Sequence, residues 1–150
     1  MNSHEYHVAL KWKEKRLGEI SSPELETSIE VATPPNFNQG IEGIWSPEHL
    51  LTAAVVSCFM TTFLAIAENS KLEFENFTCD STGKLEMIEG KFLMTEVNLF
   101  PELIIKNDAD REKAMRILLK SEQACLISNS IKAKVILHIE IKIGSPVLVK

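Results

Sequence analysis

Hydrophobic and polar residues alternate in three stretches of the chain, 7–12, 25–31 and 132–143. A period of two is typical of strands with one buried face. The pattern therefore predicts a strand in each range. Arg16-Leu17-Gly18 is a turn candidate after the first strand, and the proline-rich and asparagine-rich stretch 33–40 is predicted to be a loop.

The longest apolar stretch, around Leu50 to Ala67, is predicted to lie in a helix that runs from Pro47 to about Asn69. Ser46 can accept a hydrogen bond as its N-cap, Pro47 suits the first helical position, and Glu48 lies in the positive first turn. Apolar residues lie on nearly all sides of this helix, as in a central buried element. Because a domain this small encloses such a helix poorly, we expect a homodimer in which a second subunit helps to cover it.

A hairpin and a second helix are predicted in the C-terminal half. Glu89-Gly90 is the expected turn between strands at 83–88 and 91–99. Asn107 or Asp108 can cap a helix with its body at 109–122, and a further short helix is expected around 124–130. The apolar stripe of the longer helix would consist of Met115, Leu118 and Leu119. Together these elements predict one α+β domain, 1–150, with a mainly antiparallel sheet.

Composition and charge narrow the function classes. The net charge is −5 and hydrophobic residues make up 45% of the chain. This mildly acidic balance argues against a nucleic-acid-binding domain. The N-terminus lacks the basic and apolar segments of a secretory signal, and serine and threonine interrupt the longest apolar stretch, which argues against a membrane span. We therefore expect a soluble cytoplasmic protein.

The chain has three cysteines, Cys58, Cys79 and Cys125, and their number and spacing argue against a structural framework. An odd count without a secretory signal disfavours structural disulfides, and the absence of CxxC pairs disfavours structural zinc. The four histidines show no metal-ligand spacing with acids or thiols. We expect neither a metal nor a cofactor, and we interpret Cys79 as structural.

Cys58 lies in the middle of the apolar helix, where a cysteine is ordinarily core filler whose pKa is raised by burial. A reactive Cys58 needs a cation from outside the helix. Arg16 is a candidate because it lies in a predicted turn, although a solvated surface arginine is the ordinary alternative. Glu48 either borders the same pocket or simply favours the helix dipole. Cys125 is either a second buried thiol or a sulfur able to meet an oxidised Cys58.

Two segments resemble the signatures of the OsmC/Ohr family of organic hydroperoxide resistance proteins. The stretch Trp45 to Phe59, WSPEHLLTAAVVSCF, has the Pro-Glu that opens a central helix, an alanine-rich turn and the peroxidatic cysteine. The stretch Glu122 to Asn129, EQACLISN, resembles the second signature, around the other cysteine. The resemblance spans residues 8–143.

The resemblance implies an OsmC-like fold in an intertwined homodimer with active sites at the interface. Cys58 would attack an organic hydroperoxide and become a sulfenic acid, which Cys125 would resolve as a disulfide. Glu48 and an arginine would hold each other and the thiolate and orient the peroxide, and Arg16 resembles the arginine of the Ohr branch. A thiol reductant would complete the cycle; dihydrolipoyl groups serve some relatives.

The chain departs from the family pattern at two places. Residues 36–44 contain no arginine, unlike the loop of the OsmC branch, and Leu126 replaces the proline that often follows the second cysteine. Two alternatives to a peroxidase therefore stay open. One is a binding protein for a small apolar or thiol-containing ligand on the same fold, and the other is a structural domain with three buried thiols.

Overall fold

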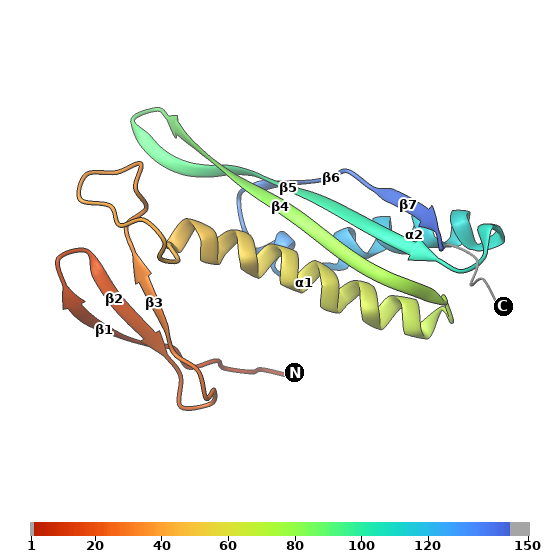
Figure 1. Ribbon diagram of the computed structural model, residues 1–150, viewed down its shortest axis with the longest axis horizontal. Coiled ribbons are helices and arrows are strands. Elements are labelled where there is room, and N and C mark those ends of the chain that lie inside the picture. Colours follow the sequence, from red (N-terminus) through yellow and green to blue (C-terminus); the bar gives the residue numbers. More distant parts are fainter. Residues whose placement is uncertain (1, 145–150) are drawn as a thin grey trace, which may run out of the picture. The chain divides into compact units, whose positions relative to one another are not determined.

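The computed structural model describes residues 2–144, in which the chain forms two compact units, Met1–Leu50 and Leu51–Lys150. In chain order the elements are β1 (Ala9–Glu14), β2 (Leu17–Ser21), β3 (Ile29–Ala32), α1 (Pro47–Asn69), β4 (Phe74–Ile88), β5 (Lys91–Ile105), η1 (Asp108–Asp110), α2 (Arg111–Ala124), η2 (Ser128–Ser130), β6 (Lys134–Leu137) and β7 (Glu140–Ile143). Figure 1 labels the helices and strands along the chain.

The N-terminal unit contains a three-stranded antiparallel sheet in the order β1-β2-β3. The turn between β1 and β2 lies at Lys15 and Arg16, one residue earlier than predicted, and Lys15 has a positive φ of 47°. Leu17 and Gly18 are already part of β2. The strand predicted at 25–31 is shorter and begins only at Ile29.

The start of α1 confirms the predicted N-cap. Ser46 Oγ accepts a hydrogen bond from the backbone N–H of His49 at 3.1 Å and pairs with His49 Nδ1 at 2.6 Å. The buried Ser46 therefore satisfies a backbone donor that the first turn leaves unpaired. The helix runs from Pro47 to Asn69, as the sequence predicted.

The C-terminal unit is organised by the long β4–β5 hairpin, which runs beside α1 in Figure 1. Its turn is Glu89-Gly90, as predicted, and both residues have positive φ angles, 48° and 80°, typical of two-residue hairpin turns. The hairpin strands are longer than expected. The predicted final strand is two strands, β6 and β7, and both pair with β5 in parallel. Parallel pairing therefore accompanies the antiparallel hairpin in this sheet.

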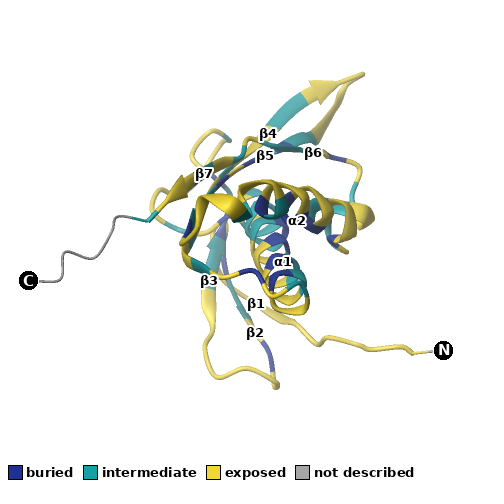
Figure 2. Cartoon of the chain, turned by 90° about the vertical axis from the view of Figure 1, so that its right-hand side faces the viewer, coloured by how far each residue is buried: buried dark blue, intermediate teal, exposed yellow. Residues whose placement is uncertain are grey.

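Both helices contribute to the core that covers β5. In Figure 2, α1 and α2 each carry dark blue segments among exposed yellow ones. The buried residues of α1 are spaced four apart: Val55, Phe59, Phe63 and Ala67. Phe63 stacks on Phe77 of β4, with ring centroids 4.7 Å apart. The core contact of α1 is thus one stripe, whereas its composition suggested burial on nearly all sides.

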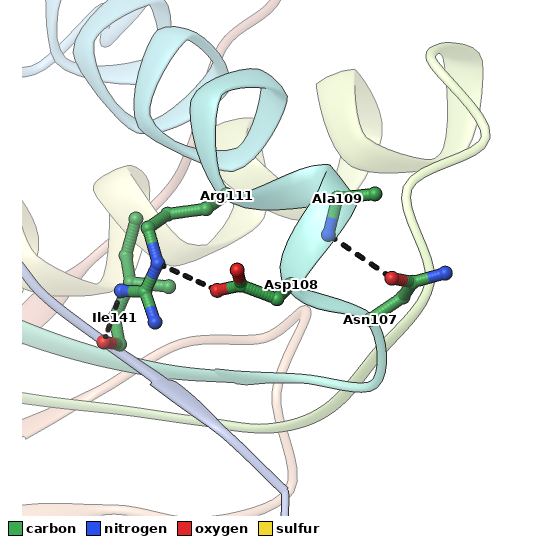
Figure 3. Close-up of polar contacts among 5 residues, drawn as sticks. All are labelled: Asn107, Asp108, Ala109, Arg111 and Ile141. Atoms are coloured by element: carbon green, nitrogen blue, oxygen red, sulfur yellow. Dashed lines mark hydrogen bonds and ion pairs between the residues drawn. The ribbon is translucent and has the colours of Figure 1, made fainter.

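The start of α2 is tied to the sheet by polar contacts, drawn in Figure 3. Asn107 Oδ1 accepts from the N–H of Ala109 at 3.0 Å and so caps η1, one turn before α2. Arg111 donates to Asp108 Oδ1 at 3.0 Å and to the carbonyl oxygen of Ile141 in β7 at 2.9 Å. The helix therefore begins at Arg111, later than predicted.

The buried stripe of α2 differs from the prediction in part. Its buried residues are Ala114, Ile117, Leu118 and Ser121. Leu118 was predicted correctly, but Met115 and Leu119 are exposed. The two small residues at the ends of the stripe let the helix approach the core closely, so the larger side chains beside them point outward.

Candidate active site

Two of the predicted site residues, Cys58 and Cys125, lie together in the C-terminal unit. Cys58 is half-buried in the middle of α1, and Cys125 is fully buried at the C-terminal end of α2. The Cys125 thiol is one of the groups that lower the pKa of Cys58, so the two side chains are neighbours in the fold. Sixty-six residues separate them in the chain, so the pairing is a product of the fold.

The segment after α2 is held by its own hydrogen bonds. The N–H of Asn129 donates to the carbonyl oxygen of Cys125 at 3.1 Å, and the hydroxyl of Ser130 donates to that of Leu126 at 2.7 Å. Cys125 itself is extended, with φ −65° and ψ 113°. The backbone N–H groups of Leu126 and Ile127 in this turn lower the pKa of the Cys58 thiol.

These donors control the ionisation of Cys58. Burial raises the pKa of its thiol, but hydrogen bonds from the N–H of Ile127, the thiol of Cys125, the hydroxyl of Thr62 and the N–H of Leu126 outweigh burial and lower the pKa below its usual value. The Thr62 oxygen lies 3.9 Å from the sulfur, one helical turn along α1. Donors to the charged form favour it, so Cys58 has the electrostatics of a nucleophilic thiolate.

Cys125 has the opposite tendency. Burial and the neighbouring Cys58 raise the pKa of its thiol, and the side chain and backbone of Ser128 lower it less strongly. When one sulfur of a close pair is anionic, the second keeps its proton. Within the pair, ionisation is therefore favoured at Cys58 and disfavoured at Cys125.

Cys79 lies in β4, packs against the core and has no such set of donors. Burial raises the pKa of its thiol to about 11; the N–H of Phe100 opposes this shift and the charge of Asp80 adds to it. Its sulfur donates to the carbonyl oxygen of Asp80 at 3.5 Å. A thiol with this pKa is almost fully protonated at neutral pH, which supports the structural interpretation of Cys79.

Arg16 and Glu48 belong to the N-terminal unit. Arg16 is exposed in the β1–β2 turn and lines a hollow of about 270 Å³ together with Trp12 and Pro47. Glu48 follows Pro47 in the first turn of α1 and is half-buried. Within this unit, Arg16 and Pro47, the residue before Glu48, therefore line the same hollow.

Residues 38–140 match the model of the OsmC-like protein family. The chain belongs to the OsmC-like family. It is 30% identical over 151 residues to the uncharacterized protein YmaD of Bacillus subtilis, an alignment that covers 96% of this chain and 99% of YmaD. The similarity thus extends over nearly the whole of both chains.

Solved structures share the fold. An OsmC-like protein of unknown function from Vibrio cholerae has a TM-score of 0.82 at 23% identity, covering 91% of this chain and 99% of its own. An organic hydroperoxide resistance protein from Elizabethkingia anophelis has a TM-score of 0.75 at 20% identity, covering 95% and 99%. In this soluble OsmC-like fold, α1 is the core helix, although its length and apolar composition alone would suit a membrane span.

Several groups at the site were missed by the sequence analysis. A cation was expected to favour the thiolate of Cys58, whereas backbone N–H groups and the hydroxyl of Thr62 lower the pKa of its thiol. Thr62 stands four residues after Cys58, a spacing that places both on one side of a helix and would have identified it. The N–H donors carry no sequence signal. Among residues 2–144, no cluster of three His, Cys, Asp or Glu side chains could hold a metal ion.

Proposed function

We propose that this protein is a thiol-dependent peroxidase that reduces organic hydroperoxides, with Cys58 as the attacked thiol and Cys125 as the resolving thiol. The observation that carries the proposal is the paired environment of the two sulfurs: Cys58 has a lowered pKa, and the neighbouring Cys125 has a raised one. This chain also shares its fold with an organic hydroperoxide resistance protein, which supports organic hydroperoxides as the substrate class.

The reaction follows from these positions. The Cys58 thiolate attacks one peroxide oxygen, the O–O bond breaks, and the departing alkoxide takes a proton to become an alcohol. The sulfenic acid on Cys58 then condenses with the Cys125 thiol, releasing water and leaving a disulfide. An external dithiol reduces this disulfide and restores both thiols. Apolar surroundings favour alkyl hydroperoxides over hydrogen peroxide, because the alkyl group gains by leaving water.

Arg16 and Glu48 are proposed to orient the peroxide, as the resemblance implies. The shared hollow of Arg16 and Pro47 supports a role for Arg16 near the start of α1. The N–H donors at Cys58 already favour its thiolate, so we assign Arg16 mainly to the peroxide. Arg16→Ala should then slow Cys58 oxidation while leaving the pKa of Cys58 nearly unchanged, with Lys15→Ala as the matched control.

A homodimer is part of the proposal. Four large apolar side chains of the two helices are exposed in the single chain, and a second copy would bury such residues: Met60, Leu64, Met115 and Leu119. Sedimentation of the purified protein tests this point. A monomer at micromolar concentration would contradict it.

A small-molecule binding protein on the same fold is the second candidate, and the hollow of about 270 Å³ beside Trp12 favours it. One experiment separates the two. The reduced protein is treated with one equivalent of cumene hydroperoxide, and its thiols are mapped by mass spectrometry. A peroxidase gives a Cys58–Cys125 disulfide with Cys79 reduced, and Cys58→Ser abolishes peroxide consumption while Cys79→Ser does not. Three unchanged thiols beside intact peroxide would refute the peroxidase.

A further inference from the structure

The side chain of Ser128 is a buried polar group for which the fold itself provides no use. Its Oγ is buried and has no hydrogen-bond partner among residues 2–144. Leaving a buried hydroxyl unpaired costs free energy, so native structures rarely do it without a reason. The other two hydroxyls nearby, those of Ser121 and Ser130, both donate to backbone carbonyl oxygens.

Ser128 faces the sulfur of Cys125. The hydrogen bond from the N–H of Asn129 to the carbonyl oxygen of Cys125 closes one helical turn. Cys125 is the extended residue that precedes this turn, a position whose side chain lies next to the residue three places further along, here Ser128. The Ser128 hydroxyl accordingly lowers the pKa of the buried Cys125 thiol. The backbone N–H of Ser128 is directed at the same atom.

We propose that Ser128 is a positioning residue for resolution: its hydroxyl donates to the Cys125 thiolate and so speeds the attack of Cys125 on oxidised Cys58. This inference rests on the proposed peroxidase function and adds to it a group that acts on the second step alone.

The unpaired hydroxyl suits this role because the acceptor appears only during the reaction. A thiol sulfur is a weak hydrogen-bond acceptor, whereas a thiolate is a strong one. The Ser128 hydroxyl is therefore poorly paired in the resting protein and well paired once Cys125 loses its proton. Such a preorganised donor stabilises the charge that forms without having to move.

The order of the two steps follows from the charge on Cys58. Cys58 on α1 is the titratable group that acts on Cys125, and its ionised form raises the pKa of Cys125. Conversion of Cys58 to a neutral sulfenic acid removes that charge. The donors of Ser128 then act on Cys125 without the opposing charge, so the second thiol becomes easier to ionise only after the first has reacted.

The step balances within the pair. The Cys125 thiolate attacks the sulfur of Cys58, an S–S bond forms and the S–O bond breaks. The hydroxide that leaves takes up the proton that Cys125 released, and the product is water. The peroxide consumed in the first step is the oxidant, so no further co-reactant is needed.

The test is a single turnover followed in time across a range of pH, with Cys79→Ser as the common background. The protein receives one equivalent of cumene hydroperoxide and is quenched with dimedone and acid. Mass spectrometry then measures the Cys58 sulfenic acid and the Cys58–Cys125 disulfide separately. The variants are Ser128→Ala, Ser128→Thr, which restores a hydroxyl, and Ser130→Ala, which removes a nearby serine bonded to the backbone.

We expect Ser128→Ala to oxidise Cys58 at the rate of the background protein but to form the disulfide roughly tenfold more slowly, the loss typical of one hydrogen bond to a charged group. The pH midpoint of disulfide formation should move upward. Ser128→Thr should restore rate and midpoint, and Ser130→Ala should match the background. The inference is overturned if Ser128→Ala resolves normally, if Ser128→Thr is as slow, or if both steps slow together as in a misfolded site. Absence of Cys58 oxidation in the background protein would instead refute the peroxidase itself.

Discussion

Two regions of the C-terminal unit each hold a half-buried cysteine and shift its pKa in opposite directions. Around Cys58, at the junction of α1 with the end of α2, burial is outweighed by hydrogen-bond donors, and the pKa of the thiol falls. In β4, burial of Cys79 is opposed by one N–H and reinforced by Asp80, and the pKa rises to about 11. Burial alone therefore does not decide whether a cysteine is inert.

The difference arises from secondary structure. A residue in the middle of a sheet is surrounded by N–H groups that are already paired within the ladder. Leu126 and Ile127 open a new helical turn, which the N–H of Asn129 closes on the carbonyl oxygen of Cys125. The first N–H groups of such a turn are not used within it, so those of Leu126 and Ile127 can donate to a sulfur. The start of this turn thus supplies the positive potential that a cation was expected to provide.

The largest expected effect is on alkylation by iodoacetamide as a function of pH. The pKa of Cys58 lies below 9 and that of Cys79 at about 11, so at pH 8 the thiolate fractions should differ by at least about a hundredfold. Cys58 should therefore be carboxamidomethylated first, and the midpoint of its rate profile should lie below pH 9, where the rate of Cys79 is still rising. Peptide mass spectrometry of timed samples measures both rates in one protein.

The matched control is the same titration in Cys125→Ser. This change removes the charge-coupled neighbour and leaves the N–H donors of the turn. Cys58 should remain the faster site. Equal rates for Cys58 and Cys79 in either protein would show that the donors do not control reactivity.

A smaller effect is expected on stability at alkaline pH. The pKa of Cys79 is higher in the folded protein than the 9.0 of an ordinary cysteine, so above pH 9 the unfolded chain releases a proton that the folded chain keeps. Stability is therefore present below pH 9 and is lost as pH rises toward 11. Because part of the thiol still contacts water, the loss should be about 1–2 kcal/mol.

Urea unfolding at pH 8 and pH 10.5 measures this loss. The free energy of unfolding of Cys79→Ala should fall less between the two pH values than that of the unchanged protein. All other groups titrate in both proteins, so the difference between the two declines belongs to Cys79. An identical decline in the two proteins would mean that Cys79 is not held as a thiol by the fold.

The sequence predicted the secondary structure around the two cysteines better than the groups that set their pKa values. The Ser46 cap, the span of α1 and the Glu89-Gly90 turn were predicted correctly because each depends on local chemistry. The parallel pairing of β6 and β7 with β5 was not predicted. It depends on how the connection through α2 returns the chain to the sheet, and no local pattern records this.

The candidate site was predictable in the same uneven way. The two sulfurs were identified from signature segments, and their meeting across 66 residues agrees with that resemblance. The donors that lower the pKa of Cys58 were not foreseen. Two of them are backbone N–H groups, which every residue except proline carries, so residue identity does not reveal their direction.

The smallest expected effect isolates one of these backbone donors. Leu126→Pro removes a single N–H, because proline has none. The extended conformation of Cys125, with φ −65° and ψ 113°, is the one that a residue before proline prefers. The exchange should therefore leave the turn intact.

Since the N–H of Leu126 makes the smallest of the donor contributions, the pKa of Cys58 should rise slightly and its alkylation at pH 7 should slow roughly twofold to threefold. Leu126→Ala is the control: the side chain is 65% exposed and its loss leaves the N–H in place, so the rate should not change. If the alanine variant slows as much as the proline variant, the side chain of Leu126 acts on Cys58 and the N–H does not. Slowing by proline alone would show that a leucine in place of the family's proline adds a donor to the reactive sulfur.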